Sequence, residues 1–191
     1  MRPQEFGKHL AWTVCSVMLG TMILPSASFA ATAAEIDASA NKILQQFRQK
    51  HAGADEALKD AKGVLVFPQI VQGGFIVGGA YGEGVLRIHG KSVSYYSIGS
   101  GSFGLTFGAA AKAVIICSML QAPLTEFQTD ARTDKSWQVG LSGDIAVVNV
   151  GASGAINSAQ LNRPIVAFTL DQQGLFFNLS LQGSKITKII R

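Results

Sequence analysis

The sequence predicts an α+β fold in which two N-terminal helices pack on a mainly antiparallel, strongly bent β-sheet. An amphipathic helical pattern comes first in the predicted domain, and long stretches of strand-type alternation follow it. Glycine is also concentrated in these strand-like stretches, because eleven of the 21 glycines lie between Gly73 and Gly108. Glycine weakens a strand unless a bulge, a bend or a close backbone approach requires it. We therefore expect a bent sheet, and its closure into a barrel is an open alternative.

Residues 1–30 have the features of a secretory signal peptide. Arg2 and Lys8 give a positive start, an apolar run of fifteen residues covers Leu10–Leu24, and small residues lead to a cleavage point after Ala30. The alternative is a transmembrane anchor, but a membrane-spanning helix needs about 20 apolar residues. The prediction is export to the periplasm or the cell envelope.

Removal of this leader leaves 191 − 30 = 161 residues, a suitable length for one domain with a helical part at 31–62 and a mostly β part at 63–191. The net charge falls from +4 to +3, because two basic residues and one acidic residue leave together. No run of lysines or arginines remains, so binding to nucleic acid has little support. Cys117 is then the only cysteine, which excludes a disulfide framework.

The clearest predicted helix covers residues 32–50. Apolar side chains recur there with the helical period, and Thr32 with Glu35 three residues later has the spacing of a capping box. A second helix is expected at residues 54–62, with Gly63 as its end. The apolar stripe of the first helix consists of Ile36, Ala40, Ile43, Leu44 and Phe47.

The remaining chain predicts strands joined by turns. A hairpin turn is expected at residues 89–91, a bend within a long strand at 99–104, a short helix or turn at 123–128, and an exposed polar loop at 129–135. The expected strand segments are 64–67, 75–88, 93–109, 113–119, 137–147, 165–170, 175–181 and 185–190.

The glycine-dense strand near residues 75–88 changes its phase of alternation past Gly84. Large side chains occupy odd positions before this point, and Leu86 and Ile88 occupy even positions after it. A slip by one residue predicts a β-bulge within residues 82–84. The neighbouring glycines should then lie where a Cβ would clash or where φ is positive: Gly78, Gly79, Gly82 and Gly84.

Several ordered motifs resemble a known family. The segments AKGVLVFP, GGFIVGG, YGEGVL, YYSIGSGSFGL and LQGSKIT are similar to those of the SYLF domain, also called the Ysc-type actin-binding or DUF500 domain. The resemblance covers nearly everything after about residue 54. It implies a lipid-binding module, known in eukaryotic relatives for phosphoinositide binding and association with actin patches. An exported bacterial-type protein would meet neither partner, so those two functions are not carried over.

The residue types that support catalysis or metal binding do not come together in the sequence. Residues 99–104 match G-x-G-x-x-G, but strand alternation continues through them and no acid follows at the dinucleotide-binding distance, so a bent strand is favoured. His51 and His89 have no partner at zinc-ligand spacing. Glu83 is interpreted as an exposed carboxylate at the bulge, with a general base as the alternative. We expect no enzyme, no metal and no cofactor.

Two functions remain. The first is a non-enzymatic module of the cell envelope that binds anionic lipid or a membrane surface, through basic side chains, the amphipathic first helix, or both. The alternative is a periplasmic scaffold whose sheet edge or groove binds an envelope protein. Packing of the helix stripe against the domain is favoured over its insertion into lipid, and the sequence does not predict an oligomeric state. The candidate lipid-binding residues are Lys42, Phe47, Arg48, Lys50, Lys59, Lys62, Lys185, Lys188 and Arg191.

Overall fold

The structure is a computed structural model, and it describes residues 30–74, 77–103, 110–132, 137–138, 145–149, 156, 158–171 and 184–191. Contacts divide the chain into two units, Met1–Ala30 and Ala31–Arg191. The predicted signal peptide lies outside the described residues except for Ala30, so export stays a prediction. The predicted strand at 175–181 and the turn before it also lie outside them.

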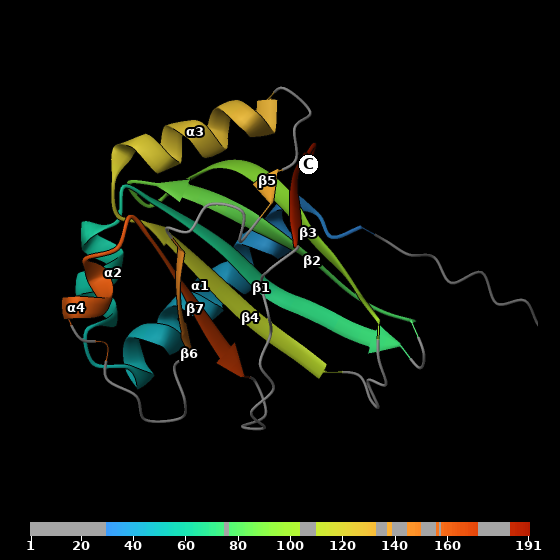
Figure 1. The fold of residues 1–191 in the computed structure, drawn as a ribbon, viewed down its shortest axis with the longest axis horizontal. Helices are drawn as coiled ribbons and strands as arrows, with labels where there is room; N and C mark the ends of the chain where they lie inside the picture. The colour runs from blue at the N-terminus through green and yellow to red at the C-terminus, as the bar shows by residue number, and fades with distance from the viewer. Residues whose placement is uncertain are drawn as a thin grey trace, which may run out of the picture. The chain divides into compact units, whose positions relative to one another are not determined.

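The second unit is an α+β domain, as predicted (Figure 1). Its described helices are α1 (Ala33–Lys50), α2 (Ala54–Asp60), α3 (Gln121–Arg132) and α4 (Ser158–Leu161). Its described strands are β1 (Gly63–Gly74), β2 (Val77–Ile88), β3 (Lys91–Phe103), β4 (Ala110–Ser118), β5 (Trp137–Gln138), β6 (Ile145–Asn149), β7 (Ile165–Asp171) and β8 (Lys185–Ile189).

The described strands form one sheet in the order β5-β8-β3-β2-β1-β4-β7-β6. All neighbouring pairs are antiparallel except β6 and β7, which run parallel. In the part of the chain that the structure describes, β5 and β6 are the two edges of this sheet and do not pair with each other. The sheet is therefore open, and the barrel alternative is not supported.

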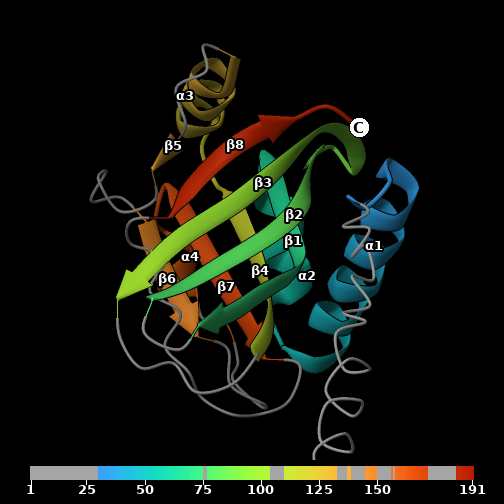
Figure 2. The same cartoon turned by 90° about the vertical axis from the view of Figure 1, so that its right-hand side faces the viewer.

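Helices cover both faces of the sheet. On one face α1 and α2 pack over a core that includes Val66, Ile115 and Phe168. On the other face α3 packs over a second core, to which the alternate residues Leu65 and Phe67 contribute. Figure 2 shows α1 and α3 well apart, with the curved strands between them. Two helices on the sheet were predicted, and α3 adds a layer on the opposite face.

The first helix follows the prediction closely. Thr32 is its N-cap, its hydroxyl accepts from the Glu35 backbone N–H, and the Glu35 carboxylate accepts from the Thr32 backbone N–H at 2.7 Å. The five predicted stripe residues are all buried. The second helix ends at Asp60, earlier than predicted, and Gly63 begins β1 instead of ending a helix.

The bulge was predicted in β2, but the structure places it in β1. Val66 pairs with Val85, and Gln69 pairs with Glu83. Between these two pairs β1 advances by three residues and β2 by only two, so the extra residue belongs to β1, beside Pro68. The change of phase in β2 has a different cause: Val85 and Leu86 are buried on opposite faces, because helices cover both sides of the sheet.

The predicted hairpin turn is confirmed. His89 and Gly90 have φ of 51° and 78° and connect Ile88 of β2 to Lys91 of β3. Two consecutive residues at positive φ are typical of a type I′ turn, which matches the twist of the flanking strands. The strand interpretation of the G-x-G-x-x-G segment is also confirmed for residues 99–103, which belong to β3.

The segment after β4 differs from the prediction. A short helix or turn was expected at residues 123–128 and an exposed loop at 129–135, yet α3 continues to Arg132. Leu124 and Phe127 are the buried residues that join it to the sheet. Two apolar side chains three residues apart are a weak helical signal, which explains why the sequence underestimates its length.

Candidate functional site at the turn end of the sheet

The apolar stripe of α1 is used inside the domain. Phe47 is fully buried, and its ring centroid lies 5.0 Å from that of Phe168 in β7. Ile43 and Leu44 belong to the same core. Insertion of this stripe into lipid would require α1 to leave the sheet. Phe47 can therefore contact lipid only in a state with α1 detached.

The side chains of the three basic candidates on α1 do not point in the same direction from the helix axis. At 100° per residue, Arg48 points about 120° to one side of Lys42, and Lys50 points about 80° to the other side. Arg48 also forms an ion pair with Asp55 of α2 at 3.2 Å, in which both side chains are more than half exposed. An exposed pair of this kind contributes little to stability. The predicted outer basic face is therefore not one patch.

The other basic candidates are also dispersed. Lys59 and Lys62 are exposed near the end of α2. Lys185 and Lys188 are exposed on β8, but their odd spacing on a strand points them to opposite faces of the sheet. Arg191 forms an ion pair with Glu83 of β2. The structure therefore does not bring the nine candidates together into one patch.

Strand register instead gathers a different set of residues at one end of the sheet. Gly63 pairs with Ser118, and Ser118 pairs with Ile165, so β1 begins where β4 ends and β7 begins. Ile88 and Lys91 flank the hairpin turn at this same end. We name this surface the turn end and define it by its exposed residues Lys62, Lys91, Val93, Leu120 and Arg163.

The turn end combines positive charge with exposed apolar side chains. Val93 and Leu120 are 48% and 54% exposed, among the largest exposures of big hydrophobic residues in the described chain. Lys62, Lys91 and Arg163 supply three cations, and Asp60 is the acidic neighbour in sequence. Only Lys62 was predicted. The others are isolated in the sequence, and strand pairing is what brings them together.

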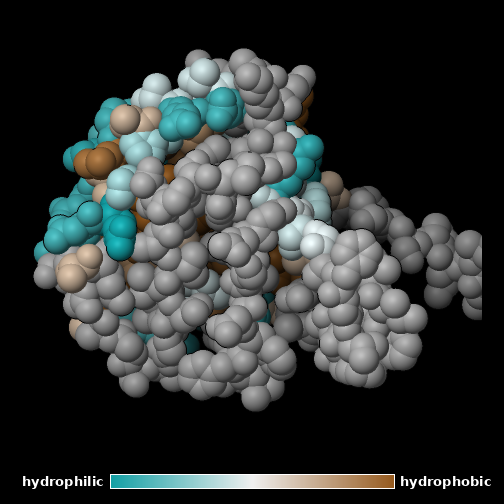
Figure 3. All heavy atoms as spheres, in the orientation of Figure 1, coloured by the Kyte–Doolittle hydropathy of each residue, from teal (hydrophilic) through white to brown (hydrophobic). Residues whose placement is uncertain are grey.

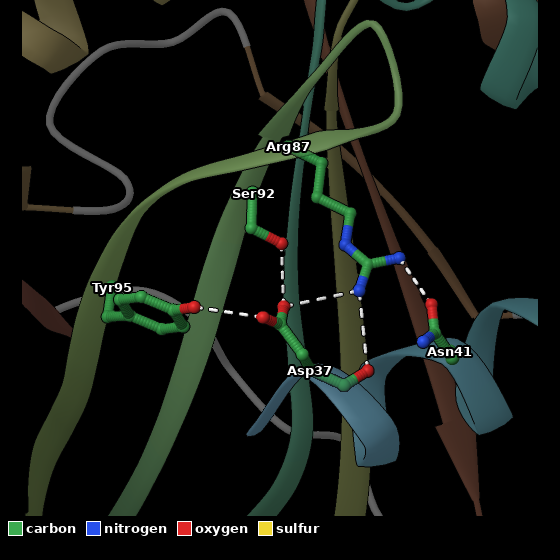
Figure 4. A network of polar contacts seen from close by, with 5 residues as sticks. All are labelled: Asp37, Asn41, Arg87, Ser92 and Tyr95. Carbon is green, nitrogen blue, oxygen red and sulfur yellow. Dashed lines mark hydrogen bonds and ion pairs between the residues drawn. The ribbon is translucent and has the colours of Figure 1, made fainter. Parts of the chain in front are cut away.

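A polar network holds α1 on the hairpin beside the turn end (Figure 4). The Asp37 carboxylate accepts from the Ser92 hydroxyl at 2.6 Å, from the Tyr95 hydroxyl at 2.9 Å and from the Arg87 guanidinium at 3.3 Å. Arg87 also donates to the Asn41 side-chain oxygen at 2.7 Å. One carboxylate thus links a helix to two strands.

The network changes the acidity of its members. Burial works to raise the pKa of Asp37, but the hydrogen bonds from Ser92, Tyr95 and Arg87, with the Arg87 charge, lower it below its ordinary value. The hydrogen bond to Asp37 raises the pKa of Tyr95, and burial adds to the effect. Asp37 therefore stays ionised at neutral pH, as an anchor for α1.

Glu83 lies in a second polar cluster on the same face of the sheet. Its Oε1 accepts from the Tyr81 hydroxyl at 2.8 Å and from the Arg191 guanidinium. Its side chain is only 10% exposed, so the prediction of an exposed carboxylate at a bulge is wrong. Burial, together with the bond to Glu83, raises the pKa of Tyr81.

The pocket beneath α3 offers little interior space for a ligand. This pocket between α3 and the sheet has a volume of about 30 Å³ and is lined by apolar residues that include Leu86, Leu124 and Phe127. That volume has room for only about two or three water molecules and is far below that of a lipid chain. Within the described chain, no group of His, Cys, Asp or Glu side chains is arranged to hold a metal ion.

Figure 3 shows one face of the domain, where hydrophilic side chains gather over α3 and near the end that carries α2. None of the helices in the described ranges combines the length and apolar character of a membrane span.

The chain matches no protein-family model, and a search of curated proteins found no relative. The resemblance to the SYLF domain therefore remains a prediction.

Proposed function

We propose that the protein is a non-enzymatic module of the cell envelope that binds anionic lipid surfaces, and that the turn end is its contact surface. The observation that carries this proposal is the exposure of Val93 and Leu120 among Lys62, Lys91 and Arg163. Amphipathic surfaces of this kind are typical of proteins that lie at a membrane interface. The SYLF-like motifs and the leader-like residues 1–30 support the same function independently.

The strength of such binding follows from the charges. Each Lys or Arg near an anionic surface contributes about 1 kcal/mol, and the attraction is screened within a Debye length. Three cations would give about 3 kcal/mol, which corresponds to a factor of about a hundred in affinity. Binding should therefore be reversible and should weaken steeply with added salt.

The alternative, a scaffold that captures a protein strand at its sheet edge, has less support. Strand addition requires a long row of free backbone groups at an edge. Among the described residues, β5 and β6 are the edge strands, and neither carries a residue of the turn end. The lysines of the turn end would also have no role in that mode of binding.

Vesicle flotation tests the proposal. We expect the protein purified from the envelope fraction to float with phosphatidylglycerol vesicles at low salt, to remain unbound with phosphatidylcholine vesicles, and to dissociate at high salt. The variant Lys62→Gln/Lys91→Gln/Arg163→Gln should bind about a hundredfold more weakly.

The matched control is Lys42→Gln/Arg48→Gln/Lys50→Gln, which removes the same charge from α1. It should bind within about threefold of the parent, since it leaves the contact surface intact. Equal losses in the two triple variants would reject the turn end, and the absence of binding to either vesicle would reject lipid binding.

A further inference from the structure

A second exposed surface lies on the α1 face of the sheet, beyond the part that α1 covers. Its position follows from the register. Gln69, Glu83, Ser97 and Thr187 form one cross-strand row over β1, β2, β3 and β8. The next row consists of Val71, Tyr81, Gly99 and Lys185, and a third contains Gly79 and Gly101. We name these three rows the platform.

The platform is open to solvent and centred on an aromatic ring. Tyr81 is 56% exposed and Val71 is 47% exposed. The Tyr81 hydroxyl is held by Glu83 at 2.8 Å, so the ring is anchored although most of its surface is free. Such a ring is a fixed apolar surface with a polar tip.

The glycines around the ring are not required by internal packing. A Cβ added at Gly101 would meet nothing within 4 Å, and at Gly79 and Gly99 it would meet only backbone oxygens at 3.4 Å and 4.0 Å. By contrast, the buried glycines of β2 face close backbone contacts. Glycine in a strand without an internal reason marks a place where a ligand can approach the backbone closely.

The polar groups of the platform can form hydrogen bonds with a ligand. Both donors to Glu83 use Oε1, and Oε2 is buried without a hydrogen-bond partner in the described residues. The carboxylate thus retains an unused hydrogen-bond acceptor beside the exposed ring. Gln69 and Thr187 add exposed amide and hydroxyl groups next to it.

The chemistry of the platform selects among ligands. Glu83 and Arg191 neutralise each other and leave one cation, Lys185, which is too little charge for a phosphate-rich ligand or a membrane surface. An extended peptide needs a free strand edge, but β1 and β2 have neighbours on both sides, and β8 pairs with Tyr95–Gly99 of β3. A neutral ligand that carries hydroxyl donors and a flat apolar face fits the ring, the glycines and the acceptors together.

We propose that the platform binds a neutral sugar residue of an oligosaccharide. The C–H face of a pyranose ring would lie on the Tyr81 ring, whose face is electron-rich, beside the bare backbone of Gly99 and Gly101. Its hydroxyl groups would exchange hydrogen bonds with Gln69 and the Glu83 carboxylate. This site is separate from the turn end and independent of lipid binding.

Nuclear magnetic resonance titration tests the site with three probes: chitotriose, cellotriose and maltotriose, each up to about 10 mM. We expect at least one of them to shift the amide signals of Gly79, Gly99 and Gly101. Tyr81→Ala should weaken that binding at least tenfold, and Gly101→Leu should do the same by filling the platform. Leu120→Ala removes an exposed apolar side chain at the turn end and should leave sugar binding unchanged.

Four results would overturn the proposal. The first is the absence of shifts with all three sugars, and the second is equal binding by the parent and Tyr81→Ala. The third is concentration-dependent dimerisation that Tyr81→Ala abolishes, while no sugar binds to the parent. That result would assign the platform to a second copy of the chain. Loss of vesicle flotation in Tyr81→Ala would also contradict it. The three substituted positions are exposed, and amide spectra with parent-like dispersion verify the fold of each variant.

Discussion

At the scale of single residues, glycine has two different roles in this sheet. At Gly84 an added Cβ would clash with the Val66 carbonyl oxygen and lie 2.6 Å from the Phe67 ring, next to the register shift of β1. At Gly82 it would lie 2.6 Å from the Gln69 carbonyl oxygen. These contacts are too short for any side chain, whereas Gly101 faces open space.

This difference predicts opposite outcomes for one substitution. Gly84→Ala should lower the free energy of unfolding by about 1–3 kcal/mol, since backbone atoms must move to admit the methyl group. Gly101→Ala should leave it unchanged or raise it slightly, because alanine restricts the unfolded chain. Urea denaturation measures both, and equal midpoints for the two variants would refute the tight approach at the bulge.

Asp37 gives a second residue-scale prediction, with a defined pH dependence. Its pKa is lowered in the folded state, so its contribution to stability is present above the unfolded pKa of about 4 and is lost as the pH falls through the folded value. Asp37→Asn should destabilise the protein at pH 7 by about 1–3 kcal/mol. The difference from the parent should shrink below about pH 4.

The control for this prediction is Asp55→Asn, which removes an exposed carboxylate from an exposed ion pair. It should change stability by less than about 1 kcal/mol at any pH. A gap between parent and Asp37→Asn that persists unchanged into acid would show that the carboxylate charge does not stabilise the α1 anchor.

At the scale of elements, α1 is the part that the sequence predicts best. Its capping box and its stripe depend on residues within four positions of each other, so local pattern is sufficient. The bulge and α3 were predicted poorly for the opposite reason. The extra residue on β1 is visible only once β1 pairs with β2, and the phase change in β2 reflects burial on both faces, which one strand cannot reveal.

The packing of α1 predicts the behaviour of Cys117. This thiol is fully buried in the core beneath α1, and burial raises its pKa to about 12. In protein that carries Cys15→Ser, Cys117 should stay unreactive toward a thiol reagent at neutral pH, with or without bound vesicles. Phe47→Ala should speed its reaction by opening the core. Fast reaction of the parent on vesicles would mean that α1 detaches and inserts, against the electrostatic account.

At the scale of the whole molecule, the candidate site is a product of topology. Lys62, Lys91 and Arg163 are far apart in sequence and come to one end of the sheet through the pairing of β1, β3, β4 and β7. Sequence reasoning predicted basic contact residues, and a lipid-binding class from motifs, but it grouped the cations by their position along the chain. Long-range register, which composition and periodicity do not specify, decides which charges act together.

The central claim, that the turn end faces the membrane, is tested most directly by one pair of labelled proteins. Val93 and Val71 are 48% and 47% exposed, so Val93→Cys and Val71→Cys differ in place but not in exposure. Buried Cys117 does not compete for the label, and Cys15→Ser removes the remaining thiol. An environment-sensitive fluorophore at position 93 should brighten and shift to shorter wavelength on phosphatidylglycerol vesicles, while one at position 71 should not change. A response at position 71 alone, or at neither position in protein that floats with the vesicles, would contradict the account.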